Sequence, residues 1–150
     1  MMRLTRKLRF AIEAVLDIAY NASDVPVQSK EIAERQGIPR RYLEQVLQHL
    51  VRADILRGVR GPRGGYRLAR ERRRIALAEI VRIVSEIELG ESAADDAGSP
   101  LGKAVLEPIW SDIEAAAMRQ LETISIEDLC RKARESGVES GRESPVDFAI

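Results

Sequence analysis

Five polar side chains on one expected helix could make paired hydrogen bonds to planar polar groups such as base edges. The helix is predicted to open at Pro39 and to end near Ala53, because proline is favoured at a first helical position and apolar residues then recur at helical spacing. Arginine can donate two hydrogen bonds to guanine, glutamine can pair with adenine, and glutamate can accept from cytosine. The polar face carries Arg40, Arg41, Glu44, Gln45 and Gln48. A merely solvated helix face is the alternative interpretation.

A second group of candidate residues lies in a glycine-rich stretch, residues 57–68, with the sequence RGVRGPRGGYRL. Glycine supplies the positive φ that tight turns need and proline fixes its own φ, so the stretch predicts a hairpin of two short strands. The arginines of its tip have little side-chain bulk around them and could approach a row of phosphates closely. The candidate contacts at this tip are Arg60, Gly61, Arg63, Gly64 and Gly65. An ordinary surface hairpin with solvated arginines is the alternative.

The elements before the hairpin have the spacing of a helix-turn-helix. A helix over 29–37 is expected to precede the helix that opens at Pro39. The small Ala33 lets the two helices approach, Gly37 turns the chain, and Leu43 seats the second helix on the core. An unrelated helical hairpin is the alternative. With an earlier amphipathic helix, these elements predict a mainly α-helical fold with a small β-hairpin wing.

The formal net charge of zero hides an asymmetry between the two halves of the chain. Residues 1–75 hold 17 basic and 8 acidic side chains and residues 76–150 hold 7 and 16, so the halves carry +9 and −9. This excess of positive charge predicts that the first half of the chain binds a polyanion. No apolar run approaches a membrane span, the N-terminus lacks a secretory signal, and the single cysteine fits a reducing compartment. We therefore expect a soluble, cytoplasmic protein without membrane contact.

The sequence contains no recognisable active site. Its one histidine, His49, lies far along the chain from its one cysteine, Cys130, and neither belongs to a nucleophile or metal motif. The hairpin glycines are not a phosphate-binding loop, because no GK[ST] follows them. We expect no enzyme activity, no metal site and no cofactor.

The second half is predicted to hold a helix over 75–87, an acidic loop over 88–100 and a long helix from Pro108 to about Thr123. Ser125 and Asp128 form a capping box for a last short helix. The long helix carries an apolar stripe that needs a partner, either the first domain of the same chain or the same helix of a second subunit. The candidate dimerisation residues are Trp110, Ile113, Ala117, Leu121 and Ile124.

These elements predict four regions. They are a winged helix-turn-helix domain over 1–87, a flexible acidic loop over 88–100, dimerisation helices over 101–135 and a flexible tail over 136–150.

A family resemblance is carried by three stretches, RLTRKLRFAIEAVLDIAY, PVQSKEIAERQGIPRRYLEQVLQHLVRADILRGVRGPRGGYRLAR and IALAEIVRIV. They resemble the Rrf2 family of bacterial transcriptional regulators, most specifically in YLEQ and VRGPRGGY. The resemblance implies a homodimeric winged-helix repressor or activator that binds a near-palindromic DNA operator. It also implies that Arg41, Tyr42, Glu44 and Gln45 enter the major groove, and that Arg60 and the wing glycines reach the adjacent minor groove.

One feature departs from the cluster-binding members of that family, which have three cysteines in the loop before the long helix. Here that loop, SAADDAGSPLGKAVLEPIW over 92–110, contains neither cysteine nor histidine. An iron–sulfur cluster needs thiolates or imidazoles, so we expect no cluster. The chain then resembles the clusterless, CymR-like type, which implies regulation of cysteine or sulfur metabolism.

The C-terminal sequence GRESPVDFAI resembles the C-terminal peptide of serine acetyltransferase, which ends in isoleucine and inserts into O-acetylserine sulfhydrylase. The resemblance implies a tail that binds this enzyme through Asp147, Phe148 and Ile150, with the terminal carboxylate held by hydrogen-bond donors. A tail without a partner is the alternative. Two other functions stay open: a subunit that regulates the enzyme without binding an operator, and a regulator whose Cys130 thiol responds to oxidation.

Overall fold

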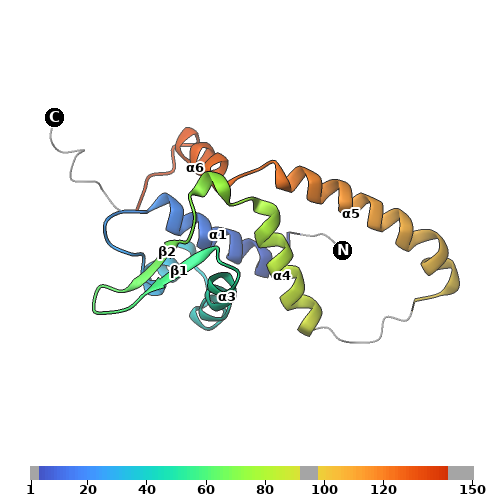
Figure 1. Cartoon of the computed structure of the whole chain (residues 1–150), viewed down its shortest axis with the longest axis horizontal. Helices are drawn as coiled ribbons and strands as arrows, with labels where there is room; N and C mark the ends of the chain where they lie inside the picture. Colours follow the sequence, from blue (N-terminus) through green and yellow to red (C-terminus); the bar gives the residue numbers. More distant parts are fainter. Residues whose placement is uncertain (1–3, 92–97, 142–150) are drawn as a thin grey trace.

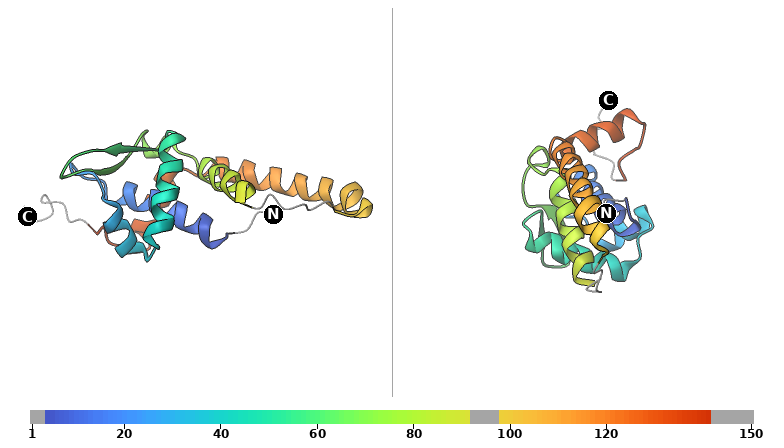
Figure 2. Two further views of the ribbon diagram at one scale, coloured as in Figure 1. Left: turned by 90° about the horizontal axis from the view of Figure 1, so that it is seen from below. Right: turned by 90° about the vertical axis from the view of Figure 1, so that its right-hand side faces the viewer.

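The computed structural model describes residues 4–91 and 98–141, and most of them are helical (Figure 1). In chain order the elements are α1 (Arg6–Tyr20), α2 (Ser29–Gln36), α3 (Arg40–Arg52), β1 (Leu56–Val59), β2 (Gly65–Leu68), η1 (Arg72–Arg74), α4 (Leu77–Glu91), η2 (Gly102–Leu106), α5 (Glu107–Glu122) and α6 (Ile126–Glu135). The predicted fold class is confirmed: a mainly helical winged helix-turn-helix with a two-stranded hairpin and C-terminal helices. The inner part of α5 packs against α4, and its outer part extends beyond the other helices as a long arm, which the left view of Figure 2 shows.

Helix α1 lies at the centre of the fold because one side of it is apolar or small. Thr5 caps its first turn, and the Thr5 hydroxyl oxygen accepts a hydrogen bond from the backbone N–H of Leu8 at 3.1 Å. The buried stripe of α1 includes Leu8, Ala11, Ala14, Val15 and Ile18. Helices α2, α3, α4 and α6 all pack against α1. Burial of this stripe is therefore what gathers the other helices into one core.

Helices α2 and α3 meet at Gly37, as the sequence predicts. A capping box between Gln28 and Glu31 starts α2, and Gly37 ends it with a φ of +64°, which favours glycine. Helix α3 begins at Arg40, one residue after Pro39. Its buried side, formed by Leu43, Val46, Leu47 and Leu50, belongs to the same core.

The wing is attached to the helices by an additional pairing that the sequence did not predict. Strands β1 and β2 pair antiparallel, with Leu56 opposite Leu68. Val27, in the connection between α1 and α2, also pairs with Tyr66, through two backbone hydrogen bonds of 3.0 and 2.7 Å. This bridge joins one edge of the hairpin to the connection between α1 and α2.

The helix predicted over 75–87 spans Leu77–Glu91 in the structure. Helix α4 continues to Glu91 rather than ending at Ile87, because no proline interrupts residues 88–91 and the hydroxyl of Thr5 donates to the Glu88 carboxylate at 3.1 Å. The acidic loop expected over 88–100 is therefore helical at its start. Residues 92–97 of that predicted loop lie outside the described residues.

The long helix begins earlier than the sequence predicted. Pro108 was expected to start it, but helical structure resumes at Pro100 and passes through the π-helical turn η2 into α5. A proline ring crowds the carbonyl four residues before it, and the wider π turn that precedes Pro108 relieves that crowding. Pro108 therefore lies inside one continuous helical segment.

Helix α6 packs with the first domain. Its capping box at Ser125 and Asp128 is confirmed, with hydrogen bonds of 3.1 and 2.9 Å. Ile126 and Cys130 are fully buried in the main core, where α6 packs against α1. The structure thus differs from the predicted grouping of residues 101–135, since α6 completes the winged-helix unit.

Candidate nucleic-acid interface

Helix α3 presents the polar side that the sequence predicted. Arg40, Arg41, Glu44, Gln45 and Gln48 are all exposed, opposite the buried leucine and valine side chains. Arg40 and Glu44 approach to 3.9 Å, an exposed contact between neighbouring helical turns that contributes little stability. These guanidinium, amide and carboxylate groups are therefore available to an external partner.

Tyr42 is placed differently from the other α3 candidates. It is half-buried, its hydroxyl donates a hydrogen bond to the Lys7 carbonyl oxygen at 2.9 Å, and its ring lies 5.8 Å from that of Phe10. These contacts direct the side chain toward α1. The hydroxyl and ring of Tyr42 fix the position of α3 relative to α1, a role that the family resemblance did not indicate.

The wing projects from the same side of α1 as α3 (Figures 1 and 2). Arg60, Gly61 and Arg63 are exposed at its tip. Within residues 4–91 and 98–141, neither Arg60 nor Arg63 makes a hydrogen bond or an ion pair. Two free guanidinium groups beside an exposed polar helix form a surface that fits an extended polyanion.

The wing glycines are required by the geometry of the hairpin itself. Gly61 has a φ of +113°, which side chains rarely adopt. A Cβ atom at Gly64 would lie 2.4 Å from the Val59 carbonyl oxygen, and one at Gly65 would lie 2.5 Å from the Val27 carbonyl oxygen. Gly64 and Gly65 are also partly buried. Gly64 thus lets the two sides of the wing approach each other, and Gly65 lets the wing approach the connection between α1 and α2.

Other arginines of the basic first half hold the fold together. Arg67 donates to the carbonyl oxygens of Ser23 and Asp24, which fastens the wing to the loop after α1. Arg70 donates to the Asp54 carbonyl at 3.1 Å and to the Glu79 carboxylate at 2.9 Å. The charge of the first half is therefore only partly available to a polyanion, which the charge count by itself could not show.

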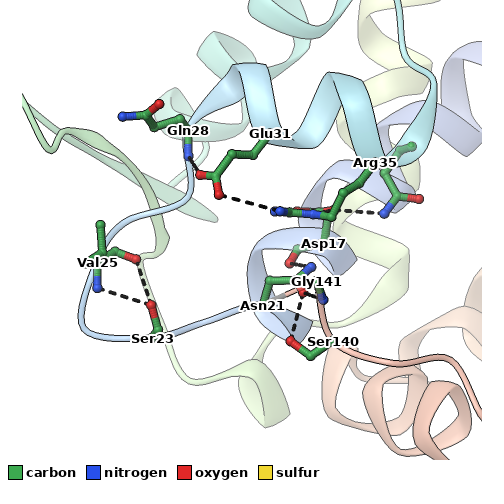
Figure 3. A network of polar contacts seen from close by, with 10 residues as sticks. Asp17, Asn21, Ser23, Val25, Gln28, Glu31, Arg35, Ser140 and Gly141 are labelled. Atoms are coloured by element: carbon green, nitrogen blue, oxygen red, sulfur yellow. Dashed lines mark hydrogen bonds and ion pairs between the residues drawn. The ribbon is translucent and has the colours of Figure 1, made fainter. Parts of the chain in front are cut away.

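A buried ion pair between α1 and α2 was missed by the sequence analysis (Figure 3). The Asp17 carboxylate, with no solvent exposure, accepts hydrogen bonds from Arg35 Nε at 2.9 Å, from a terminal nitrogen of Arg35 at 2.8 Å and from Gln36 Nε2 at 2.8 Å. The hydrogen bond to Asp17 raises the pKa of the Arg35 guanidinium. In the sequence, Asp17 stands next to apolar positions of α1, which could have indicated a buried carboxylate. Its partner Arg35 is 18 residues away, so the pairing itself had no local signal.

The comparisons with known proteins agree with this geometry. The family model named Rrf2, described as an iron-dependent transcriptional regulator, matches residues 4–132. The chain belongs to the Rrf2 family. It is 37% identical over 131 residues to the regulator IscR of Xenorhabdus nematophila, covering 87% of this chain and 80% of that one. Against IscR of Escherichia coli O1:K1 the identity is 35% over 147 residues, covering 97% and 90%.

Solved structures give the same assignment. The structure of T. potens IscR matches with a TM-score of 0.71 and 28% identity, over 98% of this chain and 96% of that chain. The structure of CymR from B. subtilis matches with a TM-score of 0.67 and 25% identity, over 88% and 98%. This Rrf2 member is therefore a DNA-binding transcriptional regulator and not an enzyme. No helix within the described residues is long and apolar enough to cross a membrane.

The residues of this Rrf2 chain do not fit an iron–sulfur cluster. Its single cysteine, Cys130, lies in the core with no exposure, and burial raises the pKa of its thiol despite the nearby Arg72 guanidinium. Its single histidine, His49, lies on α3 beside a groove of about 490 Å³ between α3 and α4. Among residues 4–91 and 98–141, no three cysteine, histidine or acidic side chains are grouped as metal ligands would be.

The candidate dimerisation residues fall into two groups. Trp110 and Ile113 are 46% and 51% exposed on the outer part of α5. Ala117, Leu121 and Ile124 are half-buried, and Leu121 packs against the core of its own chain. The other large apolar side chains exposed on this arm and on the turn η2 that precedes it are Leu101, Val105, Leu106 and Ile109. Asp147, Phe148 and Ile150, the candidate tail residues, lie outside the described residues.

Proposed function

We propose that this Rrf2 regulator binds a near-palindromic operator as a homodimer and carries no iron–sulfur cluster. The observation that carries the proposal is the pairing of an exposed polar side of α3 with two free arginines on the wing beside it. Arg40, Arg41, Glu44, Gln45 and Gln48 are proposed to contact bases and phosphates in the major groove. Arg60 and Arg63 would reach the adjacent minor groove or its phosphates, with Gly61 at the turn, while Gly64, Gly65 and Tyr42 hold these elements in place.

The proposal of a homodimer is supported by the outer part of α5. Six large apolar side chains between residues 101 and 113 are exposed, on an arm that extends from the remainder of the chain. A monomeric protein rarely exposes so continuous an apolar surface. A second copy that buries this surface around a two-fold axis would place two α3 helices symmetrically, and a near-palindromic operator matches that symmetry.

The absence of cluster ligands supports the clusterless, CymR-like type. Residues 92–110, where relatives with a cluster place their cysteines, contain no cysteine or histidine. The solved structure of CymR is described as that of the global cysteine regulator of B. subtilis. We therefore also propose that the genes regulated by this protein are those of cysteine or sulfur metabolism.

Sensing is proposed to occur through the C-terminal tail and O-acetylserine sulfhydrylase. Asp147, Phe148 and Ile150 supply one acidic and two large apolar side chains, which supports binding through an acidic group and apolar contacts. The test is a titration of that enzyme, followed by its cofactor fluorescence, with the full chain and with a chain lacking Ile150. Saturable binding that is lost on deletion supports the proposal, and no response from either chain would remove it.

An oxidation response through Cys130 is a weaker candidate. The thiol is fully buried, so an oxidant in solution cannot reach it. Burial also raises its pKa, so little of it is present as the reactive thiolate. A regulator of that kind would require the Cys130→Ser variant to lose a response to peroxide. The structure offers no specific observation that favours it.

The operator proposal is tested by selecting bound sites from a random duplex library and then titrating a selected site at several salt concentrations. About six phosphate contacts predict a loss of affinity of roughly 10³-fold between 50 and 200 mM salt. The variant with both Arg60→Ala and Arg63→Ala is expected to bind more weakly and with a lower salt slope. Lys132→Ala is the matched control, since Lys132 is exposed on α6, on the opposite side of α1 from α3.

Two results would contradict this function. If no site is enriched, or if binding does not depend on salt, the chain acts as a protein-binding regulatory subunit without an operator. If Lys132→Ala weakens binding as much as the wing variant, the surface formed by α3 and the wing is not the one that meets DNA.

A further inference from the structure

The C-terminal end of the described chain packs against the end of α1 and against Arg35 of α2. Residues 138–141, here called the strap, follow α6 and contact the last turn of α1 (Figure 3). The hydroxyl of Tyr20 donates to the Val138 carbonyl oxygen. Asn21 Oδ1 accepts hydrogen bonds from the Ser140 hydroxyl at 2.9 Å and from the Gly141 backbone N–H. The strap is thus fixed to residues about 120 positions earlier in the chain.

Asn21 is a buried side chain whose amide oxygen depends on the strap for its hydrogen bonds. It is 3% exposed, and its Nδ2 donates to the Asp17 carbonyl oxygen at 2.9 Å. Within the described residues, Asn21 Oδ1 receives its hydrogen bonds from Ser140 and Gly141. A buried amide oxygen that loses its donors is costly, so the strap and the end of α1 stabilise each other.

The strap also covers the ion pair that fixes α2. Gly141 lies so close to Arg35 that a Cβ atom at that position would be 2.6 Å from Arg35 Cδ. Arg35 is the residue of α2 that reaches the buried Asp17 carboxylate, and its own side chain is only 22% exposed. An ion pair shielded from water and salt is screened less than an exposed one. Removing the strap would hydrate Arg35 and weaken the attachment of α2 to α1.

We propose that the strap is a regulatory tie between the C-terminal end of the chain and the DNA-binding surface. Helix α2 leads through Gly37 directly into α3, so a looser α2 presents α3 to DNA less rigidly. Detachment of the strap from Asn21 and Arg35 lowers operator affinity. This regulation rests on the proposed binding of an operator, whereas the tie between the strap and α2 can be tested without DNA.

The test compares amide hydrogen exchange in α2 among five full-length or shortened chains. A chain that ends after Val138 loses the Ser140 and Gly141 contacts, and Ser140→Ala loses one of them. Exchange of the amides of residues 33–38 is expected to be about tenfold faster in the shortened chain and several-fold faster in Ser140→Ala. A chain that ends after Ser144 keeps the strap, and Glu139→Ala changes an exposed strap residue, so both controls should match the full chain.

The outcomes separate the two ideas. Equal exchange in all five chains would overturn the tie, as would acceleration that extends equally to α4, because that result reports global unfolding. Faster exchange in α2 with unchanged affinity for a selected operator would overturn the regulatory role. If the full chain binds no operator, the proposed function fails, and the exchange data still decide whether the strap supports α2.

Discussion

Gly65 shows how one residue can matter for a reason other than the one that its sequence motif suggests. The glycine-rich wing motif indicated close approach to DNA. In the structure, a Cβ atom at Gly65 would lie 2.5 Å from the Val27 carbonyl oxygen, beside the backbone bridge between Val27 and Tyr66. The absence of a side chain at Gly65 thus lets the wing attach to the loop before α2.

We expect Gly65→Ala to lower the free energy of unfolding by about 1–3 kcal/mol, because the wing must move away from Val27 to accommodate the methyl group. The measurement is urea unfolding at a fixed protein concentration. Gly58→Ala is the control, since nothing lies within 4 Å of a Cβ atom there, and it should change the value by less than about 0.5 kcal/mol. A Gly65→Ala variant of normal stability that binds an operator weakly would instead assign Gly65 to the DNA contact.

Helix α5 has two halves with different surroundings. Its inner half contributes Met118 and Leu121 to the surface of its own core. Its outer half, with Ile109 54% exposed and Ile113 51% exposed, extends beyond that core. In the sequence, the apolar stripe of this helix is continuous. The position of α5 in the fold buries the inner part of the stripe and leaves the outer part exposed.

We expect Ile109→Asp to convert the proposed homodimer to a monomer, because the carboxylate would be buried without a partner in the interface. The dissociation constant, measured by sedimentation over a concentration series, should rise about 100-fold or more. Ala115→Asp is the control, since Ala115 is exposed on another face of the same helix. A wild-type chain that sediments as a monomer at all concentrations would contradict the prediction.

At the scale of the molecule, the C-terminal segment completes the N-terminal domain. Ile126 and Cys130 of α6 lie with no exposure in the core around α1. The backbone N–H of Leu77 donates to the Ile124 carbonyl at 2.8 Å, and that of Ile126 donates to the Ile75 carbonyl at 3.0 Å. The chain therefore leaves the core along α5 and returns to it through α6.

We expect Ile126→Ala to destabilise the whole fold by about 2–5 kcal/mol, because it leaves a cavity in the only core that the described residues share. A fluorescent label on α3 and one on α6, each followed during urea unfolding, should report the same transition midpoint. Val25→Ala, at a 41% exposed position, is the control and should change stability by about 0.5 kcal/mol or less. Separate unfolding of α6, with α1–α4 intact, would show that α6 is not part of this cooperative unit.

The sequence by itself determined the elements whose signals are local. Helical spacing and caps predicted α1, α2, α3 and α6, and the density of glycine and proline predicted the wing. The polar side of α3 follows from the same spacing, since residues opposite a buried stripe are exposed.

Only the tertiary structure decided which of those polar groups are free. Arg67, Arg70 and Arg35 resemble Arg60 and Arg63 in the sequence, yet the first three bind carbonyl or carboxylate groups distant in the chain. Tyr42 and Asn21 also bind groups distant in the chain. The Tyr42 hydroxyl donates to the Lys7 carbonyl oxygen, and the Asn21 amide oxygen accepts from Ser140, which follows α6. These contacts join segments with no local periodicity in common, so the pattern of residues along the chain does not specify them.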